Sequence, residues 1–183
     1  MLAKLQRWAT GRNVIILVIL DLIFMLGVMP YMQLLMALVM NQHPQPIDLS
    51  IPTRTPDQGF ALIESYGEAG RKLYRTIELT ADVVYPLVYG FAFALLITFL
   101  VRKIAPTHKW LPYLAFLPLL AMVFDYAENL VIVTLLCTYP EKWVGVAKLG
   151  GVFTFFKWIL AFAAIGGSVI GLIVWGIKGL AKR

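Results

Sequence analysis

Three polar side chains in one apolar stretch of the chain are spaced so that they could bind a ligand or take part in catalysis. Asp125, Glu128 and Asn129 lie at positions i, i+3 and i+4, which places them on one face of a helix. Lys157 lies in another apolar stretch, and we expect it within reach of Asp125. A charged group at the centre of a bilayer costs about 2.5–3.5 kcal/mol on insertion scales, so such residues are seldom idle. This pattern predicts a polar site inside an apolar bundle.

A second helix is expected to bring acids and aromatic rings to the same outward-facing site. Glu78 and Asp82 are about one helical turn apart, and Tyr85 and Tyr89 follow at helical spacing. The two tyrosines could line the mouth of a pocket or anchor the helix at a membrane interface. Crowded carboxylates cannot all be ionised at once, so we expect the site to hold a proton or to share a bound cation.

Asp21 is expected to be separate from this group. It lies in the inner half of the first apolar stretch, too far from the other acids for direct contact. It is a candidate proton site, and the alternative is a protonated aspartate that hydrogen-bonds within the bundle.

A purely structural interpretation applies to the main group as well. Lys157 with Asp125 could be a buried ion pair that fixes helix register, and Asn129 could form an ordinary hydrogen bond between helices. Helix register needs only one ion pair, so the presence of Glu128 beside Asp125 favours a functional site.

Four apolar runs must position these residues, and each is long enough to cross a ~30 Å hydrocarbon core as a helix. The chain of 183 residues is 60% hydrophobic and 14% charged, well below the charge content of soluble domains. We therefore predict an all-α membrane protein with one integral membrane domain, residues 1–183. The four predicted transmembrane helices are residues 14–40, 82–101, 111–137 and 150–177, with an outer-side loop and helix at residues 41–81.

The outer-side helix is expected to run without interruption into the second span, over Gln58–Lys103. Thr55 is the predicted N-cap and Pro56 the first helical position. Pro86 should leave the carbonyl of Asp82 without its usual donor, and the helix could bend there or run straight.

The fourth span carries a face of small and polar residues at spacings of three and four, which would let another helix approach closely. This face contains Gly150, Thr154, Lys157, Ala161, Ala164, Ser168 and Gly171.

Basic residues gather on one side of the predicted membrane. Nine of the sixteen lysines and arginines, and none of the ten acids, fall in three segments: Lys4, Arg7, Arg12, Arg102, Lys103, Lys109, Lys178, Lys182 and Arg183. The positive-inside rule then places both termini in the cytoplasm, most simply at a bacterial inner (plasma) membrane. The formal net charge of +6 thus indicates topology and anionic lipid, and we expect no nucleic-acid partner.

Several chemistries find no support in the sequence. The single cysteine, Cys137, excludes an intrachain disulfide, and His43 and His108 fall in loops on opposite sides of the predicted membrane. We expect no cofactor, although the carboxylates could hold a hard cation or the site a lipid, and no metal site is assigned. The expected partners are the lipid bilayer and, in addition, another membrane subunit or a second copy of the chain.

Three functions remain open. The first is a non-catalytic module that binds a polar or cationic ligand, a lipid head group or a partner subunit. The second is a proton- or cation-coupled transporter acting as an oligomer, which would use acids at two depths. The third is an enzyme acting on a lipid head group, with Glu128 or Asp125 as general base and Lys157 stabilising negative charge.

Overall fold

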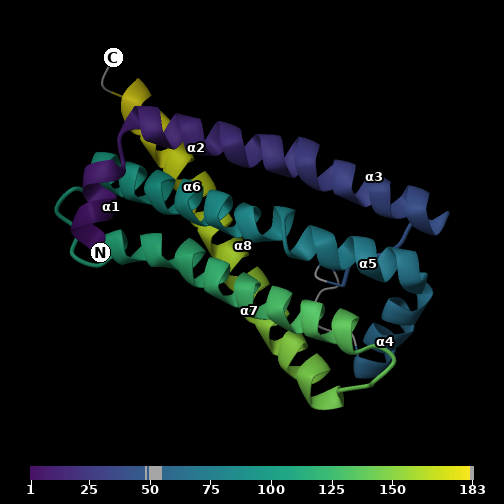
Figure 1. Cartoon of the computed structure of the whole chain (residues 1–183). Coiled ribbons are helices and arrows are strands. Elements are labelled where there is room, and N and C mark those ends of the chain that lie inside the picture. Colours follow the sequence, from purple (N-terminus) through teal and green to yellow (C-terminus); the bar gives the residue numbers. More distant parts are fainter. Residues whose placement is uncertain (48, 50–54, 182–183) are drawn as a thin grey trace.

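The computed structural model describes residues 1–47, 49 and 55–181, and every element in that part is a helix (Figure 1). Residues 48 and 50–54 of the predicted loop, and the basic residues Lys182 and Arg183, lie outside it. In chain order the elements are α1 (Leu2–Trp8), α2 (Gly11–Ile23), the π-helix η1 (Phe24–Val28), α3 (Met29–Met40), α4 (Pro56–Ser65), α5 (Gly67–Glu78), α6 (Ala81–Ile104), the 3-10 helix η2 (Leu111–Phe116), α7 (Leu117–Thr138) and α8 (Val144–Leu180).

Four helical segments are long and apolar enough to cross a membrane, which confirms the predicted fold class at that level. They are Gly11–Met40, Gly67–Ile104, Leu111–Thr138 and Val144–Leu180. The last begins six residues before the predicted boundary at residue 150.

The long helix predicted over Gln58–Lys103 is instead three helices, α4, α5 and α6. The first break falls at Gly67, whose φ of 61° lies in the left-handed region that favours glycine. The second falls at Leu79 and Thr80, where the Thr80 hydroxyl donates to the Thr76 carbonyl (2.6 Å). Threonine hydroxyls bonded back in this way bend helices. Pro86 lies inside α6 and does not end it.

The N-terminus of α4 forms as the sequence predicted. The side chain of Thr55 accepts a hydrogen bond from the Gln58 amide, and the Gln58 side chain accepts one from the Thr55 amide. Pro56 is the first helical residue. This reciprocal capping box satisfies two amides that the helix itself cannot pair.

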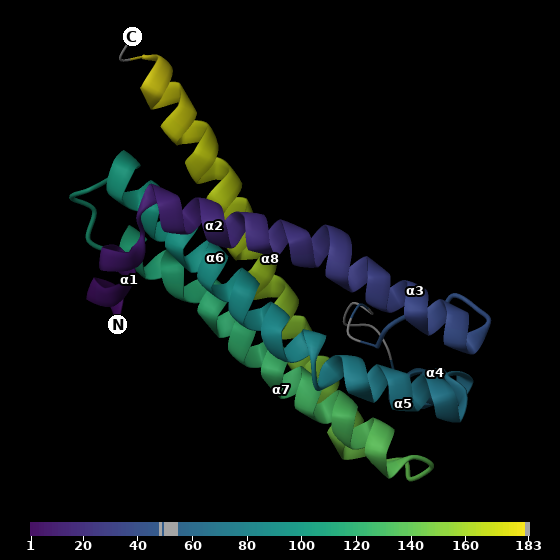
Figure 2. The ribbon, with the colours of Figure 1, turned by 45° about the horizontal axis from the view of Figure 1, so that its top comes forward.

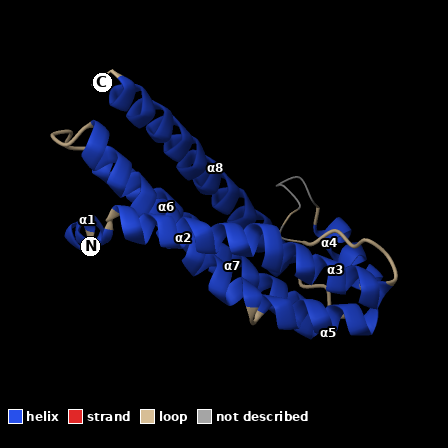
Figure 3. Ribbon diagram, turned by 90° about the horizontal axis from the view of Figure 1, so that it is seen from above, coloured by secondary structure: helices blue, strands red, loops and turns tan. Residues whose placement is uncertain are grey.

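α6 is the central helix, packed against α2, α7 and α8, and the most extensive helix–helix packing is between α7 and α8. Both termini lie at one end of the bundle and α4 at the other, which we call the α4 end (Figure 1). Two contacts tie the termini to α6: the Arg102 guanidinium donates to the Gln6 carbonyl (2.6 Å), and the Lys178 ammonium donates to the Ile104 carbonyl (2.7 Å). The last turns of α8 project past α2 (Figure 2) and run beside the end of α6 (Figure 3), which Lys178 contacts.

The small-residue face predicted for the fourth span packs as expected. Gly150, Thr154, Lys157, Ala164, Ser168 and Gly171 are the buried residues of α8. A Cβ added to Gly150 would lie 2.8 Å from Val131 Cγ1 on α7, and one added to Gly171 would lie 3.0 Å from Leu100 Cδ1 on α6. Glycine therefore sets how closely α8 approaches its neighbours.

Two apolar clusters fill the bundle and leave a polar layer between them. The cluster at the α4 end includes Ile63, Ile77 and Ile132. The cluster near the termini includes Leu95 and Ala115. Each apolar segment thus passes from one cluster to the other, and the predicted site residues lie on the intervening turns, except Glu78, which lies within the cluster at the α4 end.

We expect Gly150→Ala to destabilise the bundle by roughly 1–3 kcal/mol, because the new methyl group would overlap Val131, a β-branched side chain with little rotamer freedom. The matched control is Gly166→Ala, whose added Cβ meets nothing within 4 Å. Unfolding in mixed detergent, followed by circular dichroism, measures both. An equal effect of the two substitutions would contradict the close α7–α8 contact.

Candidate functional site

A cavity of about 380 Å³ lies in the polar layer, and all four membrane-length segments contribute to its wall. We call it the central cavity. Its polar lining residues, among those that the structure describes, are Asp21, Gln33, Tyr74, Asp82, Tyr85, Tyr89, Asp125, Asn129 and Lys157. Much of the remaining wall is apolar, with Met25, Met29, Met32 and Met36 on one side and Phe93 and Trp158 among the other contributors. A volume of this size, mostly apolar with a few convergent polar groups, is typical of small-molecule sites.

The segment that carries the methionines is shaped by Pro30. Proline cannot donate to the carbonyl four residues earlier, and the turn before it, Phe24–Val28, is a π-helix. Before this turn α2 packs on α6, and after it α3 packs on α5. We call the part of the cavity wall formed by Met25, Met29, Met32 and Met36 the methionine wall. It lies where this segment stops packing on α6 and begins to pack on α5.

Pro86 links the second and third spans through the carbonyl that it leaves without a donor. The side-chain amide of Asn129 donates to the Asp82 carbonyl oxygen (2.9 Å). One turn earlier on α7, the Tyr126 hydroxyl donates to the Val83 carbonyl (2.6 Å). The sequence predicted the free carbonyl, and the structure supplies its donor from α7, so α6 runs on through the proline.

Lys157 is the centre of a buried ion-pair network. Its ammonium forms an ion pair with Glu128 and lies 3.5 Å from Asp125 Oδ1. The Thr154 hydroxyl donates to Glu128, and the Tyr89 hydroxyl donates to Asp125 Oδ2 (2.9 Å). Three helices, α6, α7 and α8, are thereby joined at one level. The network can hold a charged group inside the bundle because each charge has an opposite charge beside it.

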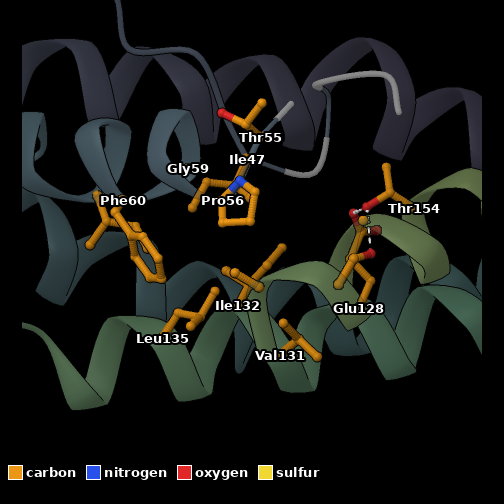
Figure 4. A pocket seen from close by; sticks show the side chains of 14 residues that line it. Ile47, Thr55, Pro56, Gly59, Phe60, Glu128, Val131, Ile132, Leu135 and Thr154 are labelled. Carbon is orange, nitrogen blue, oxygen red and sulfur yellow. Dashed lines mark hydrogen bonds between the residues drawn. The ribbon is translucent and has the colours of Figure 1, made fainter. Parts of the chain in front are cut away.

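Glu128 faces away from the central cavity, toward a second and smaller one. This side pocket of about 60 Å³ is bounded by α4, α7, α8 and Ile47. Figure 4 shows the Glu128–Thr154 hydrogen bond at one end of the side pocket and Phe60 at the other. Since Lys157 lines the central cavity, the Glu128–Lys157 ion pair separates the two spaces.

Asp21 shares the central cavity with Asp82 and Asp125, and its expected lack of direct contact with them stays a prediction. Phe24 stacks on Tyr85, with ring centroids 5.8 Å apart, and a Cβ on Gly11 would lie 3.9 Å from Phe99. α2 and α6 are antiparallel, and these two contacts align the turn of α2 that carries Asp21 with the part of α6 that carries Tyr85 and Tyr89. Asp21 lines the central cavity together with Asp125.

The remaining predicted residue, Glu78, is not part of the cavity wall. Its side chain is almost fully buried, at 1% exposure, where α5 ends, and it lines neither the central cavity nor the side pocket. The structure thus brings Asp82, Tyr85, Tyr89, Asp125, Asn129 and Lys157 to one cavity, with Asp21 in addition, and places Glu78 and Glu128 outside it.

The methionine wall is the feature that sequence reasoning missed. Its four members are spaced by four, three and four residues, so they share one helical face, and this spacing was visible in the sequence. The thioether side chain is flexible and polarisable, and it adapts to apolar ligands of varied shape. The wall gives the polar site an apolar counterpart.

The hard cation allowed by the sequence remains a prediction. Over the described residues, no group of three or more histidine, cysteine or acidic side chains is arranged to hold a metal ion.

The Pro86–Asn129 link predicts a non-additive pair of substitutions. Asn129→Ala should cost about 1 kcal/mol of unfolding free energy, because the Asp82 carbonyl loses its donor. In a Pro86→Ala background the new amide can donate to that carbonyl, so the same change should cost clearly less. A double-mutant cycle measured by unfolding in mixed detergent tests the coupling. If Asn129→Ala lowered the unfolding free energy equally in both backgrounds, the Asn129–Asp82 hydrogen bond would make no net contribution to stability.

Removal of the buried ammonium alone should lower the unfolding free energy far more than removal of all three charges of the network. Lys157→Met leaves two carboxylates without their counter-charge, and we expect a loss of about 3–5 kcal/mol. Adding Asp125→Asn and Glu128→Gln should recover most of that loss, as measured by the same unfolding assay. A triple variant no more stable than Lys157→Met would contradict this account.

Comparisons of the chain with protein-family models, with curated proteins and with solved structures found no match. The functional conclusion therefore depends on the chemistry and the geometry of the site itself.

Proposed function

We propose that this chain is an integral membrane protein that binds an amphipathic ligand in the central cavity, without catalysing its conversion. The four apolar segments would span the bilayer, with both termini on the cytoplasmic side, as the distribution of basic residues favours. The α4 end would then face outward at a bacterial plasma membrane. The polar head of the ligand would contact the Asp21, Asp125 and Lys157 layer, and its apolar part the methionine wall.

The single observation that supports this proposal most is the two-sided character of the cavity wall. Four methionines form one part, and carboxylates, tyrosine hydroxyls and an ammonium converge on another. A ligand with both a polar and an apolar part satisfies both surfaces, whereas water alone would leave the methionines unfavourably solvated.

The contacts of Lys157 favour binding over catalysis. The enzyme hypothesis needs this ammonium to stabilise negative charge that develops on a substrate. Here it pairs with Glu128 and with Asp125, the two groups that would otherwise serve as general base. The Lys157 charge is thus neutralised by carboxylates of the protein itself, and this arrangement favours a stable binding surface over a catalytic site.

A proton- or cation-coupled transporter acting as an oligomer is the second candidate function. It would use acids at two depths, whereas Asp21 and Asp125 line one cavity. Binding of a partner subunit remains an alternative use of the same polar site.

Filling the cavity tests the proposal. Ala161 lines the cavity, so Ala161→Trp should block it, whereas Ala163 is exposed on the same helix and Ala163→Trp is the matched control. Native mass spectrometry of protein extracted from membranes in a non-ionic detergent should show a retained amphiphile on the wild type and on Ala163→Trp. At least a tenfold lower bound fraction is expected for Ala161→Trp. A bare wild type, or equal retention by the two variants, would contradict the proposal.

A further inference from the structure

We infer that the polar group of the ligand is a protonated amine, and that Asp21 is the residue that binds it. This inference rests on the proposed function and names the chemical class of the ligand. It starts from Asp21, which is the one buried carboxylate outside the Lys157 network among the described residues of the cavity wall.

The Asp21 side chain is buried and faces the cavity. The residue is 8% exposed and lines the central cavity from α2. Its Oδ1 atom is fully buried, and no group in the described part of the chain hydrogen-bonds to it. A buried carboxylate oxygen in an apolar setting is costly unless a donor reaches it, so the site calls for a group that donates a hydrogen bond.

The net negative charge of the cavity wall favours a positively charged donor on the ligand. Three carboxylates, Asp21, Asp82 and Asp125, line the cavity, and Lys157 is the one basic side chain among its described lining residues. Lys157 is already in contact with Asp125 and with Glu128 on the far side of the wall. An anionic head would face this acidic excess, whereas a cation would balance it.

The rings beside Asp21 favour an organic cation over a bare metal ion. Tyr85 packs edge-on against Tyr89, with centroids 5.4 Å apart, and stacks on Phe24 in the turn that follows Asp21. Trp158 lines the cavity from α8, but the Lys157 ammonium already lies over its ring, 5.5 Å from the centroid, so the tyrosine rings are the relevant ones for a ligand cation. Aromatic faces attract alkylammonium groups, and a carboxylate adds a hydrogen-bond acceptor that selects N–H over quaternary ammonium.

The methionines define the rest of the ligand. Met25, Met29, Met32 and Met36 lie on the same segment as Asp21, and each lines the cavity. An alkyl chain attached to the ammonium would run along them. The shared chemistry is therefore a primary ammonium on an aliphatic chain, which occurs both in a free alkylamine and in an amino-headed lipid.

The test compares probes of equal chain length on the wild-type protein in non-ionic detergent. The probes are octylamine, octyltrimethylammonium, octanol and octanoate, with lysophosphatidylethanolamine as the lipid form. Binding of each probe is measured by isothermal titration calorimetry. The signal of the cavity-blocked variant Ala161→Trp is subtracted, because it reports probe taken up by micelles and by the protein surface. We expect octylammonium to bind at least tenfold more tightly than octanol, the quaternary probe to bind less well, and octanoate to bind least. Lysophosphatidylethanolamine binding more tightly than octylammonium would identify a lipid source, and the reverse a free amine.

Asp21→Asn keeps the shape of the side chain and removes its charge, and it should lower octylammonium affinity at least tenfold with little change for octanol. Asp57→Asn, on the exposed first turn of α4, is the control and should change neither. Octanol and octylammonium binding with equal affinity to the wild type would overturn the amine assignment and leave the proposed function intact. No probe binding above the Ala161→Trp baseline would overturn the proposed function itself.

Discussion

The burial of one ammonium among four apolar helices is the constraint on which the rest of the structure depends. Lys157 is buried, at 7% exposure, and in such a setting the desolvation of a charge is offset only by close opposite charges and well-formed hydrogen bonds. Glu128 and Asp125 supply the charges, and Thr154 and Tyr89 occupy the carboxylate oxygens. Because these residues come from α6, α7 and α8, the register of three helices follows from this one requirement.

The first segment is the part of the bundle that this network does not fix. Before the π-turn it packs on α6, and after it on α5, so a space opens beside the network. Asp21 is directed into this space together with the methionine wall. The cavity is thus a consequence of how Pro30 changes the partner of one helix while the other three remain locked together.

Much of the architecture could be predicted from local sequence signals. The four apolar runs, the capping box at Thr55 and the small-residue face of α8 all depend on residues close in sequence, and all of them formed. The acids of α7 and Lys157 met as expected, since a buried charge must find a partner.

What sequence reasoning missed depends on contacts between distant segments. Asp21 shares a cavity with Asp82 and Asp125 because of how α2 lies along α6, and no local pattern reports that alignment. Glu128 lines a side pocket that exists because α4 lies beside α7 and α8. The break at Gly67 separates α4 from a helix that the heptad pattern had predicted as continuous. The methionine spacing was visible, but its meaning required knowledge of which face would meet the cavity.

The most direct test of the central claim is an experimental structure of the protein in lipid nanodiscs, with the density inspected between Asp21 and Lys157. The account predicts elongated density in the central cavity, with its polar end within hydrogen-bonding distance of Asp21 and its apolar end along Met29 and Met32. A collapsed cavity, in which α3 closes on α6 and Asp21 bonds directly to a protein side chain, would contradict it.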